Sequence, residues 1–259
     1  MSGHTRRFRP SQNEIDRRYG NVRAAMEAAG LDALVVSGSE YTGFEGAVRY
    51  LTGFHILHRY AYVVIPAGGD PVAVFPREAT WVGDHGESFV RNRELPAHCG
   101  EWMAEFLKGR AARKVGVYGM EYIMNVRDYR ALAAAGFELV DFDVQFDHAR
   151  TQKSEEEIAS VRHSMEINKR GVLEVIRAYA PGKTEAELMA VAEHTFASAG
   201  CARSTMDMVQ MGPGGSLRPQ MVFPTTRPVA ASDGMLYGLE IAGEGGHWVE
   251  YSRPLMPNG

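Results

Sequence analysis

The first half of the chain alternates short apolar runs with mixed polar stretches, a pattern typical of strands and helices in turn. Ser11–Gly30 opens with a serine suited to capping a helix and closes on glycine, so it predicts a helix. Apolar runs on both sides of Ala67–Asp70 predict a β-hairpin, and Arg49–Phe54 predicts a further strand. The alternation continues to Asp143 and indicates an α/β domain with a mixed sheet.

The pattern changes near Arg150. Residues 151–200 have apolar positions at helical spacing, interrupted at Pro181-Gly182, and Thr184 with Glu187 predicts a capping box for the helix that follows. After Gly200 the chain again predicts strands, among them a hairpin over residues 234–256 with a glycine-rich turn. We therefore expect an α/β (α+β) protein with one domain over residues 1–150 and another over 151–259.

Composition and charge exclude several classes of protein. The 259 residues are 45% hydrophobic, with a formal net charge of −4, so we expect no nucleic-acid partner. The basic start has no apolar run behind it, and no apolar stretch reaches the roughly 20 residues that span a bilayer, so we expect no secretory signal and no membrane partner. Cys99 and Cys201 lie far apart, which favours a reducing, cytoplasmic location and argues against a cysteine-based zinc site.

Three segments in sequence carry a resemblance to a known family: "KSEEEIASVRHSMEI", "APGKTEAEL" and "ASDGMLYGLEIAGEGGHWVEYSR". In this order they resemble the pita-bread metallopeptidases, which include prolidase, aminopeptidase P, methionine aminopeptidase and creatinase. The segment "VRYLTGF", before a strand hairpin, is similar to the creatinase-type N-terminal domain. The resemblance implies a creatinase-type N-terminal mixed α/β domain, followed by the first half of a pita-bread domain.

The same resemblance points to Glu240 and Glu250 as candidate site residues. Peptidases of this family hold two divalent metals with two Asp, one His and two Glu, and an arginine lies three residues after the second Asp. Arg253 follows Glu250 at that spacing, so Glu250 occupies the second Asp position, and Glu240 lies closest to the first. Glutamate at both positions is one methylene longer than the family's aspartate, and the hairpin turn is one residue shorter than in the family. Met221 stands near the position of the family's loop histidine.

Three interpretations of the two glutamates remain open. They could be metal ligands for manganese or zinc in a full-length form, they could receive a cationic group of a substrate, or they could belong to an ordinary solvated hairpin in which Glu250 pairs with Arg253. No cofactor is assigned to the chain as it stands.

Three histidines are further candidates for substrate binding. His247, at the turn of the hairpin, is either a pocket residue or a solvated turn residue. In the family the N-terminal domain reaches the active site of a neighbouring subunit, so the resemblance makes His55 and His58 candidate substrate contacts in a homodimer.

Two functions follow from these observations. The first is a hydrolase of the Xaa-Pro peptidase and creatinase group, acting on the C–N bond of a small molecule or short peptide, and incomplete or inactive as this chain. In it Glu240 and Glu250 are the catalytic residues, and Arg253 orients Glu250 and is a further candidate for substrate binding. The second is a non-catalytic binding or dimerisation module that kept the fold and lost the metal site. Half a pita-bread sheet leaves strand edges uncovered, so we also expect self-association.

Overall fold

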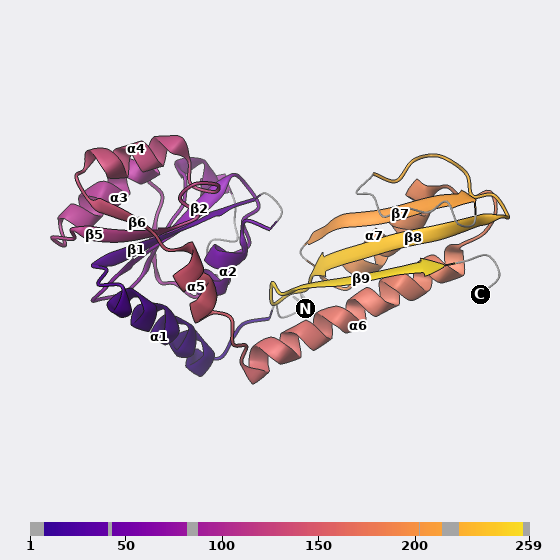
Figure 1. The fold of residues 1–259 in the computed structure, drawn as a ribbon, viewed down its shortest axis with the longest axis horizontal. Coiled ribbons are helices and arrows are strands. Elements are labelled where there is room, and N and C mark those ends of the chain that lie inside the picture. The colour runs from indigo at the N-terminus through magenta and orange to yellow at the C-terminus, as the bar shows by residue number, and fades with distance from the viewer. Residues whose placement is uncertain (1–7, 41–42, 82–87, 202, 214–222, 256–259) are drawn as a thin grey trace. The chain divides into compact units, whose positions relative to one another are not determined.

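The computed structural model describes residues 8–40, 43–81, 88–201, 203–213 and 223–255. The chain divides into two compact units (Figure 1). The N-terminal unit comprises Pro10–Ser154, and the C-terminal unit begins at Glu155 and also includes Phe8 and Arg9. In the described part of the chain, no helix is both long and apolar enough to cross a membrane.

The N-terminal unit is built on a mixed sheet of six strands in the order β4-β3-β2-β1-β5-β6. The central strand β1 pairs antiparallel with β2 and parallel with β5, and the expected hairpin is confirmed as β2 and β3. The strands are β1 (Ala33–Ser39), β2 (Tyr60–Pro66), β3 (Val72–Val74), β4 (Asn92–Glu94), β5 (Lys114–Tyr118) and β6 (Glu138–Asp141).

Helices cover both faces of this sheet, so the central strand β1 is buried at six consecutive residues rather than at every second one. One face packs against α1 (Gln12–Ala28), α2 (Gly46–Thr52) and α5 (Asp143–Ala149). The other face packs against α3 (Cys99–Lys108) and α4 (Val126–Ala134) (Figure 1). A short 3-10 helix covers Arg77–Trp81.

One sequence-based prediction in this unit is wrong. Arg49–Phe54, expected to be a strand, lies mostly in helix α2, which ends at Gly53 in the left-handed conformation with φ 71°. All residues of Ala47–Thr52 are buried, and a short apolar run that is buried on every side carries no periodicity to distinguish helix from strand. Helix α5 was not predicted either, for its seven residues leave little periodicity to detect.

The C-terminal unit packs two helices, α6 (Glu155–Ala178) and α7 (Glu185–Ser198), on one face of a three-stranded antiparallel sheet. The capping box of Thr184 and Glu187 at the start of α7 is confirmed. The strands, in the order β7-β8-β9, are β7 (Arg203–Pro213), β8 (Asp233–Ala242) and β9 (Trp248–Leu255).

Two features hold α6 close to its neighbours. The side-chain amide of Asn168 donates to the carbonyl of Leu239 over 2.7 Å, which ties the helix to the centre of β8. Gly171 leaves room for Phe196 of α7, because a Cβ at Gly171 would lie 2.3 Å from Phe196 Cε1. The contact between the two helices therefore depends on the absence of a side chain at this position.

The segment before β8 is fixed by a cluster of charges. Arg227 donates to the buried Asp233 carboxylate over 2.8 Å, and the carboxylate also accepts from the backbone amide of Ala230. Thr225 donates its hydroxyl to Glu185 of α7 over 2.7 Å. The amide of Ala230, and then Arg227, hold the pKa of Asp233 below its ordinary value, so the start of β8 is anchored by an ionised carboxylate.

We predict that Gly171→Ala destabilises the protein by about 1–3 kcal/mol, because the new methyl group overlaps the ring of Phe196. The matched control is Gly20→Ala in α1, where a Cβ meets nothing within 4 Å. A helical alanine at this open position is worth about 0.5–1 kcal/mol of added stability. Urea unfolding followed by circular dichroism measures both changes. Equal effects of the two substitutions would contradict the packing described here.

Candidate functional site

Glu240 and Glu250 lie directly opposite each other on neighbouring strands. The register of β8 and β9 pairs Glu240 with Glu250, Gly238 with Ser252 and Ala242 with Trp248. Leu239 and Ile241, on either side of Glu240, are fully buried in the core against the helices. Since side chains alternate between the faces of a strand, both glutamates lie on the face turned away from α6 and α7.

The two carboxylates repel each other. Glu240 is half-buried and Glu250 is exposed. Burial, and then the charge of Glu250, raise the pKa of Glu240 above its ordinary value. Residues that face each other in this way have Cβ atoms about 4.5–5.5 Å apart, and like charges at such positions destabilise a sheet. The pair therefore favours a proton or a positive group between its carboxylates.

His247 does not join this pair. Its Nδ1 lies 3.0 Å from the hydroxyl of Ser160, and its Nε2 lies 3.7 Å from the carboxylate of the buried Glu157, both on α6. Its side chain is only 15% exposed, so the alternative of a solvated turn histidine is wrong. His247 is also a candidate substrate-binding residue from the sequence, and the structure places it on the helix side of the hairpin.

Arg253 also lies apart from Glu250. Residues three apart on a strand point to opposite faces, so the spacing that suggested a pair in fact separates the two side chains. Arg253 donates to the carbonyl of Ser252 over 2.7 Å, and its guanidinium lies 4.9 Å from the ring centre of Tyr251. The expectation that Arg253 orients Glu250 is therefore not met.

His55 and His58 belong to the N-terminal unit and have different surroundings. His55 Nδ1 lies 2.7 Å from the carboxylate of the buried Glu45. Burial acts to raise the pKa of Glu45, but His55 and Arg49 outweigh it and leave that pKa below its ordinary value. His58 lies on an exposed loop, 4.0 Å from Glu40. His55 is thus in contact with a buried carboxylate, and His58 is accessible.

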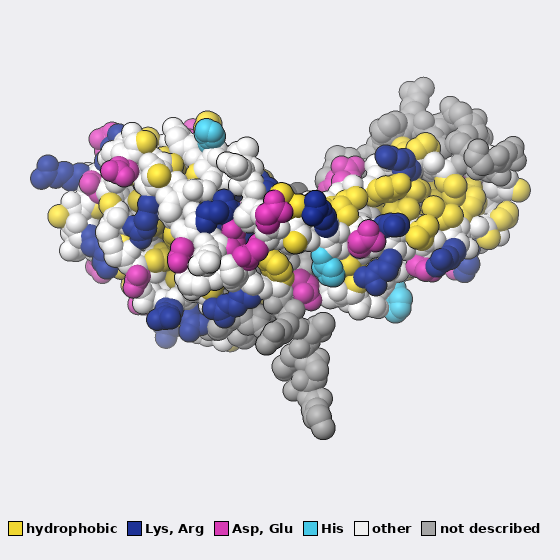
Figure 2. Space-filling view, turned by 90° about the horizontal axis from the view of Figure 1, so that it is seen from below, with side chains coloured by type: hydrophobic (Ala, Val, Ile, Leu, Met, Phe, Trp, Pro, Cys, Tyr) yellow, Lys and Arg dark blue, Asp and Glu magenta, His cyan; other side chains and the backbone are white. Residues whose placement is uncertain are grey.

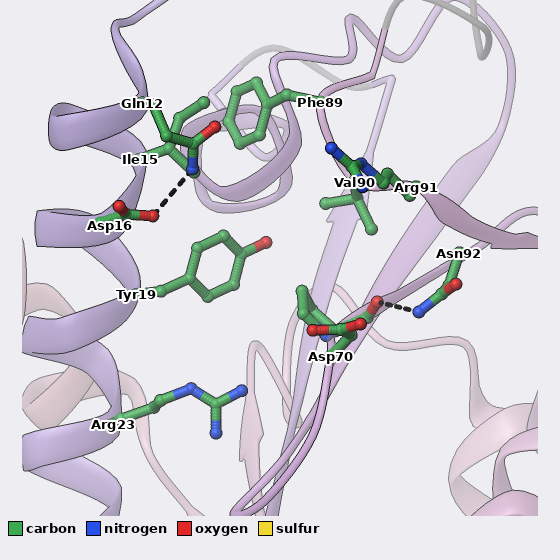
Figure 3. A pocket seen from close by; sticks show the side chains of 11 residues that line it. Gln12, Ile15, Asp16, Tyr19, Arg23, Asp70, Phe89, Val90, Arg91 and Asn92 are labelled. Atoms are coloured by element: carbon green, nitrogen blue, oxygen red, sulfur yellow. Dashed lines mark hydrogen bonds between the residues drawn. The ribbon is translucent and has the colours of Figure 1, made fainter.

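A pocket of about 390 Å³ opens on the N-terminal unit beside α1 and β4 (Figure 3). Its polar groups are largely engaged by the protein itself. Tyr19 donates to the carbonyl of Leu51 over 2.6 Å, and Arg23 donates to three backbone carbonyls, including that of Gly69. The pocket therefore offers few free polar groups for a ligand.

An apolar groove of about 310 Å³ follows α6 where the helix meets β8 and β9. Hydrophobic side chains gather on this side of the C-terminal unit (Figure 2). It lies on the helix side of the sheet and is separate from the two glutamates. Its lining residues are Met165, Glu166, Lys169, Val172, Leu173, Ile176, Tyr237 and Tyr251.

The side chains that the structure describes do not fit the metal centre that the resemblance implies. No group of three His, Cys, Asp or Glu residues in this part of the chain is placed to hold a metal ion. Two carboxylates on one hairpin supply too few of the oxygen ligands that a hard divalent cation takes. Met221, near the position of the family's loop histidine, lies outside the described residues.

Sequence reasoning missed two neighbours of the glutamates. Trp248 and Ser252 are each two residues from Glu250 on β9, so they lie on the same face, and both are half-buried. Strict alternation from Glu250 could have found them.

The fold is similar to that of solved peptidases. An X-Pro aminopeptidase from Thermotoga maritima superposes with a TM-score of 0.76 at 18% identity, covering 92% of this chain and 64% of that protein. The prolidase from Pyrococcus horikoshii gives a TM-score of 0.73 at 18% identity, with coverages of 92% and 64%. Dipeptidase PepE from Mycobacterium ulcerans gives 0.72 at 23% identity, with coverages of 95% and 66%. The chain thus spans just under two thirds of the length of these three proteins.

The expected fold class, a creatinase-type N-terminal domain followed by part of a pita-bread domain, is confirmed. A search of curated protein sequences finds no match. The profile of the creatinase/prolidase N-terminal domain family matches residues 18–152, which is just over half of the chain. The chain therefore belongs to the creatinase/prolidase N-terminal domain family.

Proposed function

We propose that the full-length protein is a hydrolase of the prolidase, aminopeptidase P and creatinase group that cleaves a C–N bond in a small, positively charged substrate. The observation that carries this proposal is the direct opposition of Glu240 and Glu250 on the open face of the β8–β9 pair. The solved proteins of similar fold include X-Pro aminopeptidase and prolidase, which supports the reaction class.

The chemistry of the pair favours an organic cation. An ammonium or guanidinium group beside the pair offsets its negative charge and forms a charge-assisted hydrogen bond with an ionised carboxylate. Trp248 lies on the same face and offers an aromatic surface that attracts a cation. The free amino group of a short peptide and the guanidino group of a small amide both meet this requirement.

The roles of the two glutamates differ because their surroundings differ. A carboxyl group with a raised pKa holds its proton closer to neutral pH, which suits proton transfer to a leaving nitrogen. Glu240 has that property, and the exposed Glu250 is then the anchor for the cation. No step in this proposal passes through a metal ion, because the described donors do not make up a metal centre.

This chain accounts for part of the proposed enzyme. It spans 64% of the Pyrococcus horikoshii prolidase, so the proposed activity is that of a longer form. The proposal includes a homodimer in the cytoplasm, in which His58 is accessible for contact with substrate across the subunit interface. The competing function is a non-catalytic binding or dimerisation module, which the altered metal positions favour.

Calorimetric titration of this chain tests the proposal. We expect guanidinoacetate or a short peptide with a free amino terminus to bind weakly, and Glu250→Gln to abolish the heat. Glu193→Gln, an exposed position on α7, is the matched control and should leave binding unchanged. Stoichiometric binding of manganese or zinc that Glu250→Gln removes would contradict the metal-free site and restore the two glutamates as ligands. No binding of any probe would favour the non-catalytic module.

The repulsion within the pair makes a prediction for stability. The raised pKa of Glu240 means that the folded protein holds this proton more tightly than the unfolded chain does. Stability is therefore lost as the pH rises through the ordinary and then the folded pKa of Glu240. We predict that Glu240→Gln stabilises the protein at pH 7 by about 0.2–1 kcal/mol, and has little effect where Glu240 is already protonated.

Urea unfolding at pH 7 and at pH 4 measures this difference. Glu250→Gln should stabilise the protein by a similar amount at pH 7. The double variant should be no more stable than either single variant, because each substitution already removes the repulsion. A loss of stability at pH 7 in both single variants would show that the carboxylates do not repel each other.

A further inference from the structure

The turn between β8 and β9 lies directly on helix α6. A Cβ at Gly243 would lie 2.3 Å from Ser164 Oγ, and one at Gly245 would lie 2.0 Å from Ser160 Oγ. Both serines are buried and one helical turn apart. The turn therefore approaches the helix so closely that these two positions admit only glycine.

His247 completes this contact from the end of the turn. It meets Ser160 through Nδ1 at 3.0 Å and Glu157 through Nε2 at 3.7 Å. The Glu157 side chain is only 1% exposed, and a buried carboxylate gains most from a polar neighbour. Further along the helix, Asn168 holds the carbonyl of Leu239 over 2.7 Å, so α6 contacts the hairpin at its turn and at the centre of β8.

The register of the hairpin matters for the two glutamates. A shift of one residue moves a side chain to the opposite face of a strand, and glycine-rich segments specify their register weakly by themselves. The five residues between the Ala242–Trp248 pair include three glycines. The constraint on register must then come from contacts outside the turn.

We infer that His247 is a positioning residue, whose contact with Ser160 and Glu157 of α6 holds the hairpin in the register that sets Glu240 opposite Glu250. A histidine at the turn thus acts on the carboxylate pair from the other face of the sheet, without touching it. The relevance of this register for a substrate rests on the proposed function, but the register itself does not.

Chemical cross-linking reads the register without any ligand. In a Cys201→Ala background, Glu240→Cys with Glu250→Cys places two thiols opposite each other, and dibromobimane becomes fluorescent when it bridges them. We expect rapid bridging in this protein. Adding His247→Ala should slow bridging by about tenfold, as expected for the loss of the hydrogen bond with Ser160. His194→Ala, at an exposed position on α7, is the matched control and should leave the rate unchanged.

A conservative replacement separates positioning from general destabilisation. His247→Asn keeps a polar nitrogen near the place of Nδ1 and should restore most of the bridging rate. Unchanged bridging in His247→Ala would overturn the inference. If that variant fails to fold by circular dichroism, Ser160→Ala replaces it with the same expectations. If His247→Ala slows bridging but no ligand binds, the proposed function is refuted and the positioning role stands. If a ligand binds but His247→Ala bridges at the unchanged rate, only the positioning role is refuted.

Discussion

The burial of one face of the β8–β9 pair against α6 and α7 is the constraint on which the rest of the C-terminal unit depends. Every second residue along the centre of β8 packs in the buried core against the helices: Met235, Tyr237, Leu239 and Ile241. The residues between them necessarily face the other way. Glu240 reaches the open face because its neighbours are apolar, and no contact made by its own carboxylate is needed to place it there.

The same constraint separates the hairpin's polar residues into two groups. Glu240, Glu250, Trp248 and Ser252 share the open face, while His247 and Arg253 lie on the helix side. Residues that look like one cluster in the sequence therefore serve two purposes. The open face holds two carboxylates at an electrostatic cost, and the helix side holds the hairpin in place. A repulsive pair that costs stability is typical of a site kept for binding or chemistry.

Sequence reasoning predicted the elements whose signals are local. The helix from Ser11, the β2–β3 hairpin and the capping box at Thr184 all depend on residues close in the chain, and all three are present. Helix α2 was misread because its apolar run is buried on all sides and shows no period.

The site was only partly predictable for a related reason. The resemblance identified Glu240 and Glu250, but the face of Glu240 depends on a register that α6 helps to fix from far along the chain. The structure does not bring Arg253 and Glu250 together. Residues three apart on a strand point to opposite faces, so the spacing of the two residues alone does not predict a contact. The alternatives for His247 stayed open because its partners on α6, Glu157 and Ser160, lie far earlier in the chain, with Ser160 87 positions before His247.

The most direct test of the account is a carboxyl-carbon NMR titration of Glu240 and Glu250 in this chain. The account predicts that Glu240 titrates above the ordinary range for a glutamate, and that its pKa falls toward that range in Glu250→Gln, because burial and the opposed charge both raise it. A Glu240 that titrates normally in both proteins would contradict the opposed carboxylate pair, and with it the site proposed for a cationic substrate.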